Sequence, residues 1–204
     1  MIINKRYISL SSIVRQASAS IPTRLGKFEM IAYAERPDEP MPQVALVTAG
    51  LNTNRPVLVR IHSECMTGDV FGSLKCDCGA QLQSALSMVM KEGGVLLYLR
   101  QEGRGIGLIN KLKAYRLQEQ GFNTLDANTH LGLEADGRQY AAAVSILLDL
   151  GIHQVRLLTN NPEKLAVFEG SPIELVERVP LIIPAQEESA DYLQTKKELM
   201  GHLL

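Results

Sequence analysis

The feature of this sequence that most restricts its fold is a regular alternation of helical and strand patterns between residues 80 and 183. Apolar residues recur at helical spacing, each time up to a glycine, in 80–92, 108–120 and 139–150, and a short helix is expected from Pro162. Apolar runs typical of buried strands occupy 95–99, 154–159 and 173–183. Strands that alternate with helices indicate a sheet that is at least partly parallel and covered by helices.

The N-terminal third is rich in strand patterns. Runs bounded by Gly, Pro and Asn favour strands at 27–35, 43–50 and 56–63. Roughly the first 20 residues and the segment 35–42 lack a regular pattern, and 189–204 favours a final helix. We therefore predict an α/β fold, with a mixed, partly parallel sheet flanked by helices in three layers (α/β/α) and a β-rich N-terminal part. Residues 1–22 are expected to form an N-terminal extension and 23–204 a single domain.

Composition excludes several classes of function. The chain of 204 residues has a formal net charge of −1, so nothing draws it as a whole toward nucleic acid or a membrane surface. No stretch approaches the ~20 apolar residues of a membrane span, and the N-terminus lacks the apolar core of a secretory signal. We expect a cytoplasmic protein with reduced thiols, in which any bound anion is held by a local basic cluster.

All three cysteines, Cys65, Cys76 and Cys78, lie in one segment rich in glycine and aspartate. Free cysteines are often buried as small apolar side chains, but three of them in a polar segment favour a metal site. On an extended backbone, Cys76 and Cys78 would point the same way with Cα atoms about 6–7 Å apart, and a turn at Gly68-Asp69 would bring Cys65 beside them. Thiolate ligands without redox chemistry favour Zn²⁺.

Two kinds of zinc site remain open from the residues alone. A closed structural site has four protein ligands, and His62 would be the fourth here. A catalytic site keeps three protein ligands and leaves the fourth position to water. The segment H-S-E-C also contains the H-x-E of zinc nucleobase deaminases, but the partner motif P-C-x-x-C is absent, so that fold is not favoured.

Residues 100–111 follow a strand and begin a helix, where a glycine-rich turn can present backbone N–H groups to an anion. The segment R-Q-E-G-R-G-I-G-L-I-N-K matches neither a Walker A loop nor G-x-G-x-x-G, because Leu108 stands at the third glycine. An ordinary flexible loop is the alternative interpretation. The cations in and just beyond this segment, which would suit several phosphate charges, are Arg100, Arg104, Lys111 and Lys113.

A second junction from strand to helix lies at 158–165. Thr159, Asn160 and Asn161 can cap the helix that follows. The same polar groups would suit a phosphate or a base, so a plain capped helix and a binding site both stay open.

Taken together and in this order, the thiol segment, the glycine-rich segment and L-T-N-N-P resemble the GTP cyclohydrolase II family of riboflavin biosynthesis. The motifs that carry the resemblance are R-x-H-S-E-C, G-D-x-x-x-S-L-x-C-D-C-G and R-Q-E-G-R-x-I-G-L. The resemblance covers residues 24–204 and is densest from 57 to 182. No second segment is long enough for the butanone-phosphate synthase domain that some relatives carry, so the stand-alone form is the expectation.

The resemblance implies hydrolysis of GTP at imidazole C8 and at the α-phosphate, giving formate, pyrophosphate and 2,5-diamino-6-ribosylamino-4(3H)-pyrimidinone 5′-phosphate. It implies one Zn²⁺ per chain on Cys65, Cys76 and Cys78 with water as the fourth ligand, and Mg²⁺ with the triphosphate. A homodimer is also expected from the family, with GTP as substrate and with neither nucleic acid nor membrane as partner.

The resemblance also assigns individual residues. Arg138 matches the residue proposed as nucleophile on the α-phosphate and Asp136 its proton acceptor, although from the residues alone Asp136 resembles a surface N-cap. Tyr115 matches the tyrosine needed to complete C8 hydrolysis and release formate, where a tyrosine on a helix face would otherwise be assigned to the core. The matched GTP contacts are Arg60, His62, Ser63, Glu64, Gln81, Glu102, Gly103, Arg104, Thr124, Thr159 and Lys164.

Two positions depart from the family pattern. Gln43 stands where a histidine is expected, and residues 184–191 replace an asparagine-rich stretch before the C-terminal helix.

Two other functions stay open. One is a relative that opens the ring but retains the formyl group, against which Tyr115 argues. The other is a non-catalytic nucleotide-binding module with a structural zinc, which would have no use for Asp136 and Arg138.

Overall fold

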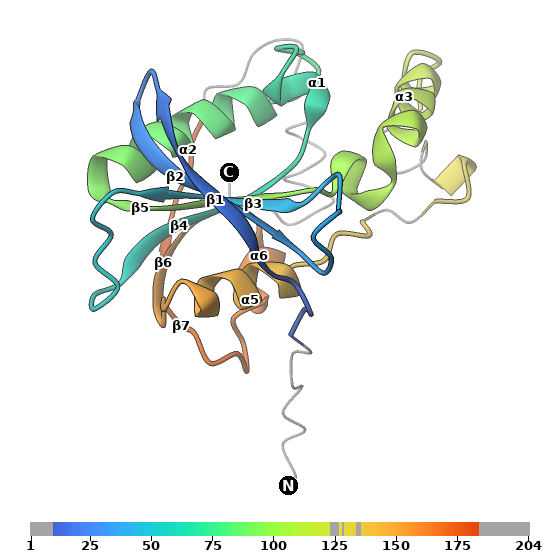
Figure 1. The fold of residues 1–204 in the computed structure, drawn as a ribbon. Helices are drawn as coiled ribbons and strands as arrows, with labels where there is room; N and C mark the ends of the chain where they lie inside the picture. The colour runs from blue at the N-terminus through green and yellow to red at the C-terminus, as the bar shows by residue number, and fades with distance from the viewer. Residues whose placement is uncertain (1–9, 123–126, 128, 134–135, 184–204) are drawn as a thin grey trace, which may run out of the picture.

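The computed structural model describes residues 10–122, 127, 129–133 and 136–183 of the chain. They build a seven-stranded sheet in the order β1-β2-β3-β5-β4-β6-β7 (Figure 1). The strands are β1 (Val14–Thr23), β2 (Gly26–Ala34), β3 (Gln43–Thr48), β4 (Val57–Ser63), β5 (Gly94–Leu99), β6 (Gln154–Leu158) and β7 (Glu174–Val179). Pairing is antiparallel from β1 to β5 and parallel from β5 to β7. The predicted mixed, partly parallel sheet is therefore confirmed.

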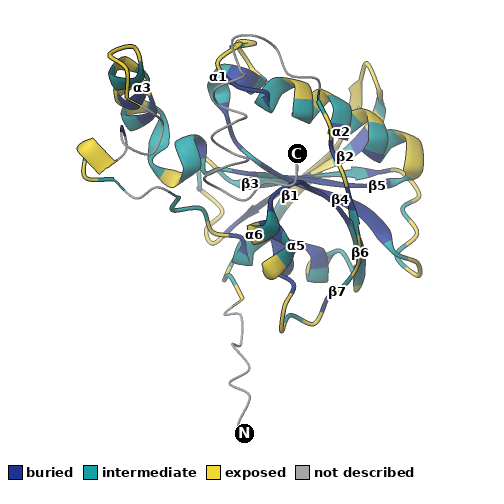
Figure 2. Cartoon of the chain, turned by 180° about the vertical axis from the view of Figure 1, so that it is seen from behind, coloured by how far each residue is buried: buried dark blue, intermediate teal, exposed yellow. Residues whose placement is uncertain are grey.

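Helices cover both faces of this sheet (Figure 1). The structure includes the helices α1 (Met66–Asp69), α2 (Cys78–Glu92), the 3₁₀ helix η1 (Glu102–Gly105), α3 (Gly107–Gln118), α5 (Ala141–Asp149) and α6 (Pro162–Ala166). α2 packs on one face and α5 on the other, which confirms the three layers. α3 extends away from the sheet (Figure 1, Figure 2). Within the described residues, no helix combines the length and the apolar character needed to cross a membrane.

The two faces are built by alternation along the central strands, whose side chains are buried (Figure 2). In β4, Val59 and Ile61 pack in the cluster that contains α5, while Leu58 packs with α2 on the opposite face. Arg60 and His62 follow Leu58 at the same period of two, so they fall on the α2 side near the carboxyl end of the strand. Polar side chains thus gather where the parallel strands end, which is where open α/β sheets bind ligands.

The N-terminal residues differ from the prediction. Residues 14–23, expected to belong to a loose extension, form β1, which pairs with β2 along its length. Its side chains are mostly exposed, so no alternation of buried apolar residues marked it as a strand. Arg15 ties β1 to α5 through an ion pair of 2.9 Å with Asp149. The prediction of a loose extension is therefore wrong from residue 14 onward. The rest of the domain division stays a prediction. The helix expected at 189–204 lies outside the described residues.

Candidate active site

The three thiols expected to bind metal come together after β4, at the start of α2. Their sulfur atoms lie within 4.8 Å of one another, and the Sγ atoms of Cys65 and Cys76 are 3.6 Å apart. Tetrahedral ligands at the usual Zn–S length of about 2.3 Å would stand about 3.8 Å apart, so donor type and spacing both fit zinc. Among the described residues, no histidine or carboxylate joins this group of sulfurs. His62 is therefore not supported as a fourth ligand.

Two glycines allow α1 to approach the start of α2. A Cβ at Gly68 would lie 2.9 Å from Sγ of Cys76, and a Cβ at Gly79 would overlap the carbonyl oxygen of Gly68. The extended run expected from Cys76 to Cys78 is wrong, because Asp77 has φ −91° and ψ 8° and Cys78 already begins α2. The sulfurs therefore meet because two short-range turns and a close helix contact converge, and not because they share one side of a strand.

Asp69, at the end of α1, holds the backbone of Cys65. Its Oδ2 accepts the N–H of Cys65 at 2.9 Å, and its own N–H donates to the carbonyl oxygen of Cys65 at 2.7 Å. The hydroxyl of Tyr98 donates to the same carboxylate at 2.9 Å, and Nε2 of His62 lies 3.1 Å from both of its oxygens. This carboxylate side chain is only 2% exposed. Burial lowers the pKa of His62, so a neutral imidazole faces Asp69.

Hydrogen bonds within the cluster separate the ionisation of the three thiols. Donation from the thiols of Cys76 and Cys78 lowers the pKa of Cys65. The same interactions raise the pKa of Cys76 to about 11 and also raise that of Cys78, because a thiol that donates to a neighbouring thiolate holds its proton. A divalent cation removes this conflict, since it binds all three sulfurs as thiolates.

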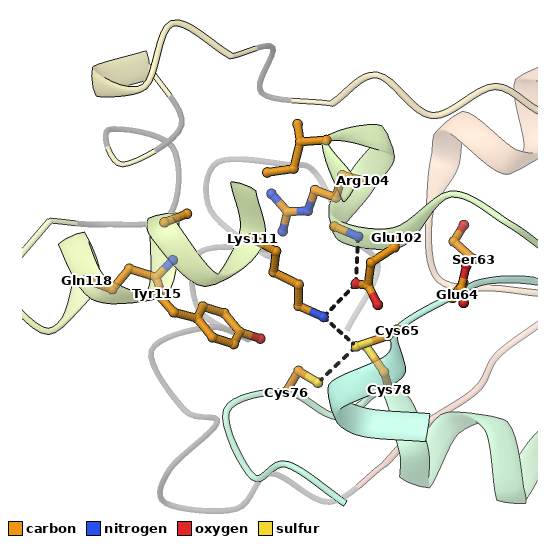
Figure 3. Close-up of a pocket in the computed structure, with 13 residues that line it drawn as sticks. Ser63, Glu64, Cys65, Cys76, Cys78, Glu102, Arg104, Lys111, Tyr115 and Gln118 are labelled. Carbon is orange, nitrogen blue, oxygen red and sulfur yellow. Dashed lines mark hydrogen bonds and ion pairs between the residues drawn. The ribbon is translucent and has the colours of Figure 1, made fainter. Parts of the chain in front are cut away.

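A pocket of about 90 Å³ opens beside the thiols (Figure 3). The residues expected from the sequence that line it are Ser63, Glu64, Cys65, Cys76, Cys78, Glu102, Gly103, Arg104 and Tyr115. The same wall includes Lys111, which the sequence grouped with phosphate-binding cations. In the structure, Nζ of Lys111 instead lies 3.1 Å from Sγ of Cys65.

Glu102 joins the elements that surround this pocket. One of its carboxylate oxygens accepts the N–H of Gly103 and the ammonium of Lys111, each at 2.7 Å, and the other accepts the N–H of Met66 at 2.6 Å. Gly103 and Arg104 both have φ of 62°. A left-handed conformation costs a non-glycine residue such as Arg104 on the order of 1 kcal/mol, and strain of this kind is typical of functional sites.

Tyr115 reaches the pocket from α3. Its ring centroid lies 5.0 Å from Nζ of Lys75 and 5.7 Å from Nζ of Lys111. Burial raises the pKa of Tyr115 to about 12, so the phenol keeps its proton at neutral pH. Tyr115 is therefore available as a hydrogen-bond donor beside the thiols, and not as a base.

Two cations expected to contact GTP are buried at the carboxyl ends of the central strands. Arg60 donates through Nη1 to the carbonyl oxygen of Leu158 at 3.0 Å and through Nη2 to Oε1 of Gln81 at 2.6 Å. Lys164 donates to the carbonyl oxygen of Ile61 at 2.7 Å. Burial lowers the pKa of Arg60 to about 10, so it remains charged at neutral pH. These two cations thus place positive charge near the edge at which open α/β sheets bind ligands.

The junction after β6 is a capped helix. Oδ1 of Asn161 accepts the N–H of Glu163 at 2.9 Å, and Oγ1 of Thr159 accepts the N–H of Asn161 at 3.0 Å. The side-chain amide of Asn160 donates to the carbonyl oxygen of Leu181 at 2.6 Å and accepts its N–H at 3.1 Å. These bonds support the capping interpretation, and Thr159, an expected GTP contact, is itself buried.

Asp136 and Arg138 form a pair beside η1. Nε of Arg138 donates to both carboxylate oxygens of Asp136, at 2.8 and 3.0 Å. Between them, the N–H of Gly137 donates to the carbonyl oxygen of Arg104 at 3.0 Å. Burial opposes ionisation of Asp136, but the hydrogen bonds from Arg138 outweigh it and lower its pKa. Tyr140 occupies the N-cap of α5, so the surface N-cap interpretation of Asp136 is wrong.

Two further positions complete the comparison with the sequence. Oε1 of Gln43 accepts the N–H of Arg100 at 2.7 Å, so this departure from the family pattern ties β3 to the end of β5. Thr124 lies outside the described residues. Sequence reasoning missed Asp69 and the contact of Lys111 with a thiol. The sequence placed Asp69 only in a turn and in a family motif, and it singled out Lys111 only as a cation that would suit phosphate.

Comparison with known proteins places the chain in a family. The family model of GTP cyclohydrolase II matches residues 14–180. The riboflavin biosynthesis protein RibBA of Bacillus cereus is 55% identical over 193 residues, which are 94% of this chain and 48% of that protein. The RibBA proteins of Bacillus mycoides and Bacillus cytotoxicus are 53% and 52% identical over the same shares. The chain thus spans about half the length of the curated relatives it matches.

Among solved structures, RibBX of A. baumannii, described as a two-domain 3,4-dihydroxy-2-butanone 4-phosphate synthase, aligns with a TM-score of 0.46 and 21% identity. The alignment covers 84% of this chain and 40% of that one. This likeness is too low to add to the argument.

The fold and the site define a member of the α/β class in which a cluster of three thiols adjoins a pocket at the carboxyl edge of the sheet. The match over residues 14–180 makes the assignment specific. The chain belongs to the GTP cyclohydrolase II family, whose members are hydrolases.

Proposed function

We propose that this chain catalyses the GTP cyclohydrolase II reaction, the first step of riboflavin biosynthesis. GTP and water would give formate, pyrophosphate and 2,5-diamino-6-ribosylamino-4(3H)-pyrimidinone 5′-phosphate, through hydrolysis at imidazole C8 and at the α-phosphate. The observation that carries the proposal is the meeting of three thiols with Glu102, Arg104 and Tyr115 in one pocket. The identity to RibBA proteins, which are named for riboflavin biosynthesis, supports the pathway.

The three cysteines would hold one Zn²⁺ per chain, with the fourth position left to water. When bound, the ion would supply Lewis-acid activation of the water used at C8. The chain itself sets the position of that chemistry, because Asp69 holds Cys65 and the contact of Gly68 with the start of α2 holds the other two thiols against it.

Tyr115 would act on the imidazole end of the substrate. Because burial raises its pKa to about 12, the phenol is a donor at neutral pH. It can therefore hydrogen-bond the oxygen that is added at C8 and favour cleavage that releases formate. Glu102, already held by Lys111 and two backbone N–H groups, presents a fixed carboxylate to the donors of a guanine edge.

The phosphate end would be bound by the cations of the carboxyl edge, with Mg²⁺ accompanying the triphosphate. Arg138 is better suited to stabilise charge at the α-phosphate than to attack it, because a guanidinium stays protonated and its partner Asp136 holds two of its hydrogen bonds at Nε. With a lowered pKa, Asp136 remains a carboxylate that orients Arg138. A covalent guanylyl adduct trapped on Arg138 would contradict this assignment.

The test is incubation of the zinc-loaded protein with GTP and Mg²⁺, followed by a formate assay, a pyrophosphate assay and the mass of the nucleotide product. We expect one formate and one pyrophosphate for each GTP, and loss of both after zinc is removed by a chelator. A product that keeps the formyl group would assign the chain to ring opening alone. Unchanged GTP with fully zinc-loaded protein would refute the proposal.

The homodimer is proposed from the family resemblance, and the cytoplasmic location from the three thiols, which are expected to be reduced. Sedimentation of the purified chain tests the dimer, for which a species of about twice the chain mass of 22.5 kDa is expected. Fractionation of the source cells tests the location.

A further inference from the structure

Lys111 is a buried lysine with an unusual pair of partners. Its ammonium lies 2.7 Å from Oε1 of Glu102 and 3.1 Å from Sγ of Cys65 (Figure 3), and its side chain is only 10% exposed. A buried charge requires compensation, and Glu102 provides it. The sulfur is a second acceptor, placed by a different element of the fold. Lys111 therefore links the glycine-rich turn, which contains Glu102, to one of the three clustered thiols.

The fold makes room for this link. Lys111 stands on α3, and its stem passes against Gly103 in η1, where a Cβ would lie 3.2 Å from Cβ of Lys111 and 3.7 Å from its Cδ. Gly103 also has φ of 62°, a conformation that glycine adopts without strain. On the same helix, Tyr115 places its ring 5.7 Å from the ammonium. Glu102, Gly103 and Tyr115 thus confine the ammonium beside the sulfur.

The charges explain what such a contact would do. Three thiolates and one divalent cation leave a net charge of −1, and the carboxylate of Glu102 brings the total to −2. Lys111 returns this total to −1. A sulfur that accepts a hydrogen bond from an ammonium also donates less electron density to its metal, so the metal polarises its remaining ligand more strongly. An ion pair without the sulfur contact would lack this second effect.

We propose that Lys111 is a positioning residue that compensates the charge of the metal-bound thiolates through Cys65 and so raises the Lewis acidity of the zinc. The inference rests on the zinc site proposed above. It extends that function to a residue whose sequence signal pointed only to phosphate. Because Lys111 acts through a ligand sulfur, its loss should lower kcat by about 10–100-fold and change KM much less.

The experiment uses the full chain with cobalt(II) in place of zinc, since thiolate-to-cobalt charge transfer reports the electron density on sulfur. Lys111→Met removes the charge and keeps a stem of similar length. Lys111→Met alone leaves the carboxylate of Glu102 buried without its ion-pair partner, which destabilises the fold. The double variant Lys111→Met/Glu102→Gln removes both charges and therefore serves as the test if the single variant does not fold. Lys111→Arg keeps the charge. Arg116→Met is the matched control, because Arg116 is an exposed cation on the same helix.

We expect one cobalt per chain in every variant. The charge-transfer band should move to longer wavelength in Lys111→Met and in the double variant, return toward the wild-type position in Lys111→Arg, and stay in place in Arg116→Met. An unmoved band in the double variant, or an equal shift in Arg116→Met, would overturn the inference. Wild-type protein that binds no cobalt would overturn the zinc site as well. If the band shifts as expected but the protein leaves GTP intact, the proposed function is refuted and the inference about Lys111 stands.

Discussion

Replacing Gly68 by alanine should displace a metal ligand directly. The new Cβ would lie 2.9 Å from Sγ of Cys76, 3.1 Å from Cβ of Cys78 and 3.2 Å from the backbone nitrogen of Gly79, whereas ordinary contacts begin at 3.4 Å. The sulfur of Cys76 must therefore retreat by about 0.5 Å, the difference between 3.4 and 2.9 Å. Metal–ligand distances are held to within about 0.2 Å, so the displacement exceeds what the site tolerates.

The same substitution has a smaller effect on stability. Extra volume in a packed contact destabilises by about 1–3 kcal/mol, and Gly68 has no positive φ that would add backbone strain. We therefore expect a folded protein that binds zinc at least about 10-fold more weakly, as seen when the surroundings of metal ligands are disturbed. Competition with a chromophoric chelator measures the affinity, and denaturant unfolding measures the stability.

Gly72→Ala is the matched control for Gly68→Ala. Gly72 follows α1 in the chain, with φ of 65°, and a Cβ there would meet nothing within 4 Å. Alanine at this position should strain the backbone by about 1 kcal/mol and leave zinc affinity unchanged. The reasoning would be refuted if Gly68→Ala bound zinc as tightly as the wild type while Gly72→Ala showed the expected loss of stability. The close contact of α1 with α2 would then not set the geometry of the thiols.

Three further outcomes are expected. Asp69→Asn keeps the size of the side chain but removes its charge and one of its acceptors, so chelator competition should show zinc affinity about 10–100-fold lower. Because burial lowers the pKa of His62, the folded state binds fewer protons at this residue than the unfolded chain does. The contribution of His62 to the free energy of unfolding should therefore be full above pH ~6.5 and decline below it. Denaturant unfolding at pH 7.5 and pH 5.5 should show a smaller decline in stability for His62→Gln than for the wild type. Asn161→Ala removes the N-cap of α6 and should cost about 1 kcal/mol in denaturant unfolding without loss of zinc.

The elements that the sequence predicted well are those whose signal is local. The runs that became β4 and β5 have near-continuous apolar sequence because both faces of these strands are covered, and the glycine after α2 marks its end. β1 was missed because its side chains are mostly exposed, so its pairing with β2 left no apolar period to detect. Its place depends on backbone hydrogen bonds and on the ion pair of Arg15 with Asp149.

The site shows the same division between what residue type reveals and what only the fold reveals. Cysteine chemistry predicted that Cys65, Cys76 and Cys78 come together, and the structure brings their sulfurs together; the backbone expected between the last two was extended, and the structure has a turn there. Nothing in the residue types of Asp69 or Lys111 distinguishes them from surface charges. They contact Cys65 only because β4, α1 and α3 converge on it, and that convergence depends on sheet order.

This convergence also distinguishes the thiol cluster from a metal site that organises its own domain. The two apolar clusters lie on opposite faces of the sheet and include residues of the central strands far from the sulfurs, such as Val59 and Leu58. We expect burial of that apolar surface to drive folding without metal. The thiols stand at the carboxyl edge, where hydrogen bonds to Asp69 and Lys111 set their surroundings. The core therefore determines where the site is, and a few buried charges determine how strongly a bound metal can act.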